Sequence, residues 1–322
     1  MTDAAPRCVA LSGGVGGAKL ALGLSHVLPA DHLLVVANTG DDFEHLGLLI
    51  CPDIDTVTYT LAGLNNRETG WGRADEGWRF METLAALGGE TWFRLGDRDM
   101  ALHLERTRRT GAGESLSAVT ADIARRLGVA VRIAPMSDQP VRTLVETPDG
   151  ALPFQHYFVR EQCTPKVAGF RFEGAEAAEP AAAFAAALEG GPEAVVICPS
   201  NPFISIDPIL SIPGVPAALR RSKAPVVAVS PIVGGRAIKG PTAKMMAELG
   251  LPSGAVEVAR HYDGLIDGFV LDSCDAESAD AVKALGLAVH VTGTVMQTLN
   301  DKTRLAREVL DFAQSIASPA DC

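Results

Sequence analysis

Four short apolar segments, each closed by small or polar residues, constrain the fold of this chain most strongly. They occupy residues 9–11, 33–37, 194–197 and 226–229, and helical stretches separate them. Nearly continuous apolar runs are typical of parallel strands that are buried on both faces of a sheet. The sequence therefore predicts an α/β fold, with a Rossmann-like three-layer α/β/α core around a mostly parallel sheet. Because ligands bind at the carboxyl ends of such strands, the loops that follow these segments should converge on one site.

Between residues 67 and 128 the pattern changes to helices without a convincing strand. We interpret this segment as a small helical insertion into a nucleotide-binding core made of residues 1–66 and 129–322. The helices expected in the insertion cover residues 76–87, 97–109 and 114–127. In the core we expect further strands at 131–133, 141–145 and 152–159, the last of them antiparallel, a surface helix at 175–188 and a C-terminal helix at 303–316. The C-terminal helix either packs internally or forms a subunit interface.

The composition argues against several classes of function. The 322 residues carry a net charge of -11 with a pI near 5.1, whereas nucleic-acid-binding domains usually present a basic face. We therefore expect a small phosphorylated ligand and no nucleic acid. The six cysteines lack the spacing of a zinc site, and no apolar run reaches the ~18 residues of a membrane span. These features favour a cytoplasmic protein with no membrane partner.

Four aspartates lie close together directly after the apolar segment 33–37. They are Asp41, Asp42, Asp53 and Asp55. Carboxylates alone repel phosphate, but with a bound Mg²⁺, which prefers oxygen ligands, such a cluster becomes a phosphate site. The alternative for one of them is that Asp53 or Asp55 caps a helix that begins near Thr56.

A glycine-rich loop, residues 12–19, follows the first predicted strand and opens a helix that ends near Leu28. Its glycines, Gly13, Gly14, Gly16 and Gly17, would let backbone N–H groups approach a phosphate at the helix N-terminus. The loop is not a Walker loop, because Ala18 and Leu20 replace the second glycine and the Ser/Thr. Lys19 falls where a dinucleotide fingerprint needs its third glycine. The glycines could instead serve only to pack a close strand-to-helix turn.

Polar residues also follow the other two predicted strands. Ser200 and Asn201 are suited to contact a ribose or a base, although a plain turn explains them equally well. Ser230 begins a loop whose cations could neutralise a diphosphate or stay solvated, namely Arg236, Lys239 and Lys244.

The insertion offers a weaker candidate site. Asp97 and His103 could form a second polar site, but Asp97 is also well placed as a helix N-cap, and a lone histidine lacks a base partner. The chain has no Gly-x-Ser-x-Gly elbow, so the sequence does not support an activated-serine hydrolase.

The motifs taken together resemble the 2-phospho-L-lactate transferase family of coenzyme F-420 biosynthesis, which includes phosphoenolpyruvate transferases. The resemblance spans nearly the whole chain in the expected order. It depends on residues 13–17, 38–42, 51–56, 71–72, 95–99, 135–138, 199–202 and 230–232.

This resemblance implies a Mg²⁺-dependent transferase. A deazaflavin, 7,8-didemethyl-8-hydroxy-5-deazariboflavin, would attack a guanosine-diphosphate-linked donor through its ribitol hydroxyl, and GMP would leave. The transferred group would be phospholactyl, phosphoenolpyruvyl or phosphoglyceryl, and the residues do not choose among them. A homodimer is expected.

The resemblance also implies roles for individual residues. Asp41, Asp42 and Asp55 would be catalytic, with Asp42 and Asp55 as metal ligands, and catalysis would be mainly positioning and electrostatics. Trp71 would stack on the deazaflavin, unless it is a core anchor of the insertion. The remaining substrate-binding residues would be Gly13, Gly14, Gly16, Gly17, Lys19, Asn38, Thr39, Ser200, Asn201 and Ser230.

Two other functions fit the sequence less well. A non-enzymatic nucleotide-sugar-binding regulator, similar to the gluconeogenesis-factor family, would share the glycine-rich start and a related acidic loop. Segments 51–56 and 135–138 favour the transferase, because we would not expect both in the regulator. An NAD-dependent oxidoreductase is disfavoured by the failed dinucleotide fingerprint.

Overall fold

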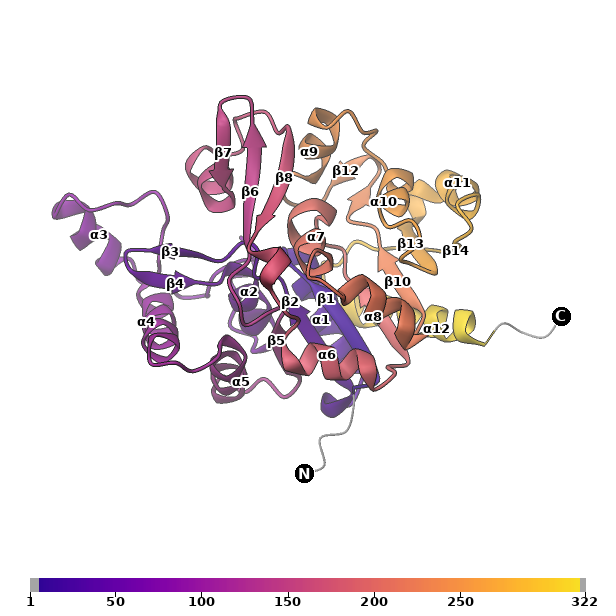
Figure 1. Cartoon of the computed structure of the whole chain (residues 1–322), viewed down its shortest axis with the longest axis horizontal. Coiled ribbons are helices and arrows are strands. Elements are labelled where there is room, and N and C mark those ends of the chain that lie inside the picture. Colours follow the sequence, from indigo (N-terminus) through magenta and orange to yellow (C-terminus); the bar gives the residue numbers. More distant parts are fainter. Residues whose placement is uncertain (1–5, 319–322) are drawn as a thin grey trace.

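A seven-stranded parallel sheet forms the centre of the protein in the computed structural model, which describes residues 6–318 (Figure 1). The strand order is β14-β13-β10-β9-β1-β2-β5, and every neighbouring pair is parallel. The four predicted segments are the adjacent strands β10, β9, β1 and β2, and all their residues are buried, as continuous apolar runs require. The α/β prediction is therefore confirmed. The strands are β1 (Cys8–Ser12), β2 (Leu33–Ala37), β5 (Arg132–Pro135), β9 (Ala194–Ile197), β10 (Val226–Val229), β13 (Gly268–Asp272) and β14 (Ala288–Thr292).

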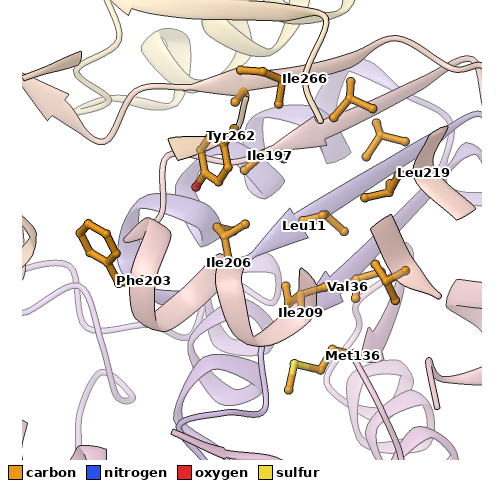
Figure 2. Close-up of a cluster of buried hydrophobic side chains, with 14 of the residues drawn as sticks. Leu11, Val36, Met136, Ile197, Phe203, Ile206, Ile209, Leu219, Tyr262 and Ile266 are labelled. Atoms are coloured by element: carbon orange, nitrogen blue, oxygen red, sulfur yellow. The ribbon is translucent and has the colours of Figure 1, made fainter. Parts of the chain in front are cut away.

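Helices cover both faces of this sheet and complete the three layers. On one face, α1 (Gly14–Val27) and α12 (Leu299–Ala317) bury apolar side chains against the strands. The other face is covered by α6 (Ala182–Glu189), α8 (Val215–Ser222), α10 (Ala255–His261) and α11 (Ala279–Lys283). Figure 2 shows part of this second core, where Leu11 and Val36 of the sheet lie near Ile206 and Ile209.

The C-terminal helix packs internally, which is the first of the two predicted alternatives. A capping box of Thr298 and Asp301 starts α12 earlier than predicted. Gly23 of α1 meets its backbone so closely that a Cβ would lie 2.2 Å from the carbonyl oxygen of Lys302. Within residues 6–318 no single helix is both long and apolar enough to cross a membrane, and only a pair bent by 80°, Pro202–Leu210 with Val215–Ser222, passes that test jointly.

The insertion contains three helices, as predicted: α3 (Arg79–Ala86), α4 (Asp97–Gly111) and α5 (Leu116–Arg126). Asp97 is not the N-cap of its own helix, because Gly96 holds that position. Its carboxylate instead accepts from the Phe80 amide of α3 at 3.0 Å, while Glu76 accepts from the Arg98 amide of α4 at 2.8 Å. Asp97 thus satisfies an orphan amide of α3, and Glu76, which precedes α3, satisfies orphan amides of α4. Helix α3 begins three residues later than predicted.

An unpredicted hairpin joins the insertion to the core. Strands β3 (Phe43–His45) and β4 (Leu48–Ile50) pair antiparallel between the two halves of the acidic segment. Leu48 and Ile50 pack with Met81 and Leu95 of the insertion in a separate apolar cluster. Three-residue strands carry too little periodicity to be read from sequence. The domain limits at 67 and 128 remain a prediction.

A second, antiparallel sheet has the order β7-β6-β8, from β6 (Arg142–Thr147), β7 (Gly150–Pro153) and β8 (Gly169–Glu173). The predicted strand 152–159 is wrong beyond Pro153, where a π-helix, η2 (His156–Arg160), buries Tyr157. The predicted helix 175–188 starts only at Ala182, because Pro180 disfavours helical geometry in the residue before it.

Helix α2 and several shorter elements complete the fold. They are α2 (Pro52–Leu61), α7 (Asp207–Leu210), α9 (Thr242–Glu248), β11 (Ile232–Val233), β12 (Arg236–Ala237), η1 (Ala30–His32), η3 (Ala175–Ala177), η4 (Pro202–Ile206) and η5 (Ser273–Ser278).

Candidate active site at the sheet switch point

The loops after β1 and β9 meet where the sheet order reverses. From β1 the chain continues to β2 on one side, whereas β9 lies on the other side, which is the position where open α/β sheets bind ligands. Ser200 Oγ donates to the carbonyl oxygen of Gly13 at 2.8 Å and lies 3.2 Å from the Gly13 amide nitrogen, which donates to it. The predicted convergence is confirmed for these two loops.

The four glycines of the first loop have different roles. A Cβ on Gly16 would lie 2.1 Å from the carbonyl oxygen of Pro199, and one on Gly17 would lie 2.5 Å from Ser12 Oγ. These two glycines allow the close strand-to-helix turn, which is the predicted alternative to phosphate binding. Gly14 differs, because its φ is +62° and a Cβ there would meet nothing within 4 Å. The amides that follow Gly14 in the first turn of α1 are the orphan donors suited to a phosphate.

Asp53 joins the glycine loop to the loop after β2. Its carboxylate accepts from the Gly14 amide at 2.7 Å and from Asn38 Nδ2 at 3.0 Å. Asn38 Oδ1 in turn accepts from the Gly40 amide at 2.8 Å, which fixes the orientation of the side-chain amide. Burial raises the pKa of Asp53 to about 6, and the two hydrogen bonds oppose that shift.

The helix-cap alternative for Asp53 and Asp55 is wrong. Helix α2 begins at Pro52 with Cys51 as its N-cap, because proline suits the first helical position. Both aspartates therefore lie inside the first turns of α2.

Asp41 and Asp42 form the unsatisfied part of the site. Both are buried, and Oδ1 of each has no hydrogen-bond partner in the structure. Burial raises the pKa of Asp41 well above its ordinary value, and the nearby Asp53 charge adds to the shift. Burial also raises the pKa of Asp42 to about 7, although Arg142 opposes it. Buried unpartnered carboxylate oxygens are costly, so this pair is prepared for a cation or a proton.

Asp55 already has a cationic partner. Arg106 of α4 donates to both of its oxygens, from Nη1 to Oδ2 at 3.1 Å and from Nη2 to Oδ1. Arg106 is almost fully buried, and Nη1 also lies 3.4 Å from the carbonyl oxygen of Leu49. The role of Asp55 as a metal ligand stays a prediction, and it would require Arg106 to give up this pairing.

His103 completes the same buried network. Its Nδ1 lies 3.7 Å from Asp55 Oδ2, and burial lowers its pKa to about 4, so the ring is neutral near pH 7. Sequence reasoning noticed His103 but missed Arg106. The available signal was an arginine three residues after His103, on the buried face of α4 that also contains Leu102.

Magnesium fits only part of the predicted ligand set. Among residues 6–318 no group of three or more His, Cys, Asp or Glu side chains is arranged to hold a metal ion. Mg²⁺ is nevertheless often bound by one or two carboxylates together with substrate phosphates. The orphan oxygens of Asp41 and Asp42 suit that arrangement, whereas Asp55 does not while it is paired with Arg106.

The other predicted residues lie in varied environments. Thr39 is buried with Oγ1 unpartnered, beside the aspartates in sequence. Ser230 Oγ donates to the Ile232 carbonyl oxygen at 2.8 Å, and Asn201 Oδ1 accepts from the Phe203 amide at 3.0 Å. Both side chains therefore bond within their own turns. Lys244 pairs with a glutamate of its own helix, Glu248, at 2.7 Å.

The loop at residues 66–72 lies over the glycine loop. A Cβ on Gly70 would be 2.7 Å from Val15, and Lys239 donates to the Thr69 carbonyl oxygen. Trp71 is 56% exposed, so it is not a core anchor of the insertion. Lys19 is half-buried; burial, followed by the charges of two other lysines, Lys302 and Lys239, lowers its pKa.

Comparison with known proteins adds an independent line of evidence. A family model described as 2-phospho-L-lactate transferase CofD matches residues 8–308. A phosphoenolpyruvate transferase of Streptomyces griseus is 43% identical over 317 residues, covering 96% of this chain and 99% of that protein. A 2-phospho-L-lactate transferase of Methanococcoides burtonii is 38% identical over 308 residues, covering 96% of this chain and 100% of that protein.

A solved structure supports the fold alone. A crystal structure of a UPF0052 family member from Bacillus halodurans superposes with a TM-score of 0.62 at 16% identity, covering 95% of this chain and 98% of that one.

Proposed function

Since the chain belongs to the 2-phospho-L-lactate transferase family of coenzyme F-420 biosynthesis, we propose that it transfers a phosphorylated three-carbon acid from a guanosine-diphosphate-linked donor to the ribitol hydroxyl of the deazaflavin. The observation that carries the proposal is the pair of unsatisfied buried carboxylates, Asp41 and Asp42, close to the glycine loop at the switch point. Such a site suits a diphosphate that arrives with a divalent cation.

The reaction is a displacement at phosphorus. The acceptor hydroxyl oxygen bonds to the phosphorus that carries the acid, and the bond from that phosphorus to the bridging oxygen breaks. The bridging oxygen leaves with GMP, and the hydroxyl proton passes to a carboxylate of the Asp41 and Asp42 pair.

The chain's own residues mainly bind and position the donor. The amides of α1 that follow Gly14 donate to phosphate oxygens, and the half-buried Lys19 adds positive charge. Asp53 keeps the glycine loop and Asn38 in register through its two hydrogen bonds. Mg²⁺, held by Asp41 and Asp42, would offset the negative charge that develops on the diphosphate oxygens.

For the donor we propose the enolpyruvyl form. The Streptomyces relatives, at 42 to 43% identity, are named phosphoenolpyruvate transferases, as is a relative of Nocardia farcinica at 37%, whereas the methanogen relatives named for phospholactate are 36 to 38% identical. The higher identity of the Streptomyces relatives supports the choice of donor.

A donor panel tests the function. The purified protein is incubated with deazaflavin, Mg²⁺ and guanylylated lactyl, enolpyruvyl or glyceryl donors, and GMP release is measured with and without the acceptor. We expect acceptor-dependent release, fastest with the enolpyruvyl donor. No release with any donor, together with tight binding of a UDP-sugar, would overturn the proposal in favour of a regulator.

A further inference from the structure

A small cleft adjoins Asp42 between the core and the insertion. Its volume is about 240 Å³, and its wall includes Thr39, Asp42 and Leu49 on the core side and Leu116 on the insertion side. Thr39 and Asp42 are each 2% exposed, and Thr39 Oγ1 and Asp42 Oδ1 lack hydrogen-bond partners. Two buried polar groups without partners at one small cleft indicate that a polar ligand completes it.

Arg142, at the start of β6, supplies the cation of this cleft. Its Nη1 donates to the carbonyl oxygens of Val141 at 2.9 Å and Thr39 at 3.5 Å, which fix the base of the guanidinium. Within residues 6–318 these are the only hydrogen bonds found from this side chain. An arginine has five N–H donors in a planar fork, so the donors on Nε and Nη2 remain for a ligand.

Two acidic side chains of the cleft, Glu114 and Asp138, already have hydrogen-bond partners other than Arg142. Glu114 is bonded to Arg109 at 3.0 Å, and Asp138 accepts from the Ser117 amide at 2.7 Å. Asp42 is the proposed ligand of Mg²⁺. A carboxylate that enters beside Arg142 therefore meets a guanidinium whose hydrogen bonds, among the described residues, go only to two backbone carbonyl oxygens.

The size of the cleft selects among the parts of the two substrates. Pockets for drug-sized ligands usually measure about 300–1,000 Å³. The cleft volume of about 240 Å³ falls below that range, so it suits a three-carbon acid better than a three-ring deazaflavin with its ribityl chain.

We propose that Arg142 binds the carboxylate of the three-carbon acid and thereby places the adjacent phosphorus beside Asp42. This inference depends on the proposed function, because it presumes a donor that carries such an acid. An Arg–carboxylate pair is planar and bidentate, which orients the acid as well as holding it. Arg142 is then a specificity residue for the donor rather than for the acceptor.

The test crosses one change in the protein with one change in the donor. GMP release is measured for wild type, Arg142→Met and Arg142→Lys with the enolpyruvyl donor and with its carboxyl methyl ester. Arg160→Met removes an exposed arginine from the end of η2 and serves as the matched control.

We expect the methyl ester to raise the donor KM of the wild type roughly 10- to 100-fold, the usual worth of a charged hydrogen bond. Arg142→Met should raise the KM for the acid by a similar factor and should no longer distinguish acid from ester. The lysine variant should keep part of the discrimination, and the acceptor KM should not change. Arg160→Met should behave as wild type.

Two outcomes overturn the inference separately from the function. If the wild type releases GMP but accepts acid and ester equally, Arg142 does not read the carboxylate, and this result needs no variant to fold. If Arg142→Met weakens acid and ester by the same factor, the residue has only a structural role. A wild type that releases no GMP from any donor overturns the proposed function instead.

Discussion

Replacing Asp42 with asparagine should stabilise the metal-free protein while it abolishes turnover. The side chain is 2% exposed, and its Oδ1 has no hydrogen-bond partner. Burial raises its pKa from 3.8 to about 7, despite the opposing charge of Arg142. Above that pH the buried carboxylate is ionised in the folded protein, and its charge destabilises the folded state. Asparagine keeps the shape and removes the charge.

The size of the effect follows from the pKa difference. A carboxyl group whose folded pKa is raised contributes most below its unfolded value of 3.8, and that contribution is lost as the pH rises through about 7. At about pH 8 the full shift costs about 4 kcal/mol, at 1.36 kcal/mol per pKa unit. At about pH 5 the carboxyl group is protonated in the folded protein and ionised in the unfolded chain, and the cost to the free energy of unfolding is only about 2 kcal/mol. The gain from Asp42→Asn should therefore be about 2 kcal/mol larger at about pH 8 than at about pH 5.

Urea denaturation in the presence of EDTA measures this difference at both pH values. Asp149→Asn, an exposed aspartate in the turn between β6 and β7, is the matched control and should change the free energy of unfolding little at either pH. Millimolar Mg²⁺ should stabilise the wild type more than Asp42→Asn. A gain that is equal at the two pH values, or a loss at both, would refute the reasoning that Asp42 is a buried charge awaiting a cation.

Two further substitutions test the supports of the site. Asp53→Asn should lower GDP affinity and kcat, roughly by the 1.5–3 kcal/mol of a charged hydrogen bond, because its new amide would face the amide of Asn38. Titration calorimetry and kinetics measure this, and the exchange variant with Asn38→Asp should recover part of the loss; no recovery would contradict the proposed bridge. Arg106→Met should destabilise the protein by about 3–5 kcal/mol, because it leaves Asp55 buried without its partner. Denaturation measures that loss, and the added change Asp55→Asn should relieve it. Asp55→Asn alone also tests the predicted metal role, because full Mg²⁺-dependent activity in that variant would leave Asp55 only as the partner of Arg106.

The central sheet could be predicted because its signal is local. Each of the segments 33–37, 194–197 and 226–229 is buried on both faces, so nearly every residue in it must be apolar. The turn residues after them are equally local, which is why the edge that carries the site could be named. The family was recognised from motifs in order along the chain, and the family match confirms it.

The roles of the acidic residues could not be predicted in the same way. The four aspartates are alike in sequence, yet Asp53 bonds the glycine loop, Asp55 pairs with Arg106, and Asp41 and Asp42 are left with an oxygen that has no partner. Asp55 and Arg106 are 51 residues apart, so no local pattern joins them. The hairpin β3–β4 was missed for the related reason that it is stabilised by packing against the insertion.

The sequence by itself determined the α/β class, the order of the loops around the crevice and the family, because apolar periodicity and turn chemistry act over a few neighbouring residues. Only the tertiary structure decided which carboxylate bridges two loops, which one forms an ion pair and which two keep an oxygen without a hydrogen-bond partner in the described part of the chain. That division depends on partners brought together by folding, as when Gly13 meets Ser200 across 187 residues. The properties of a buried charge depend on those neighbours, and a sequence pattern does not specify them.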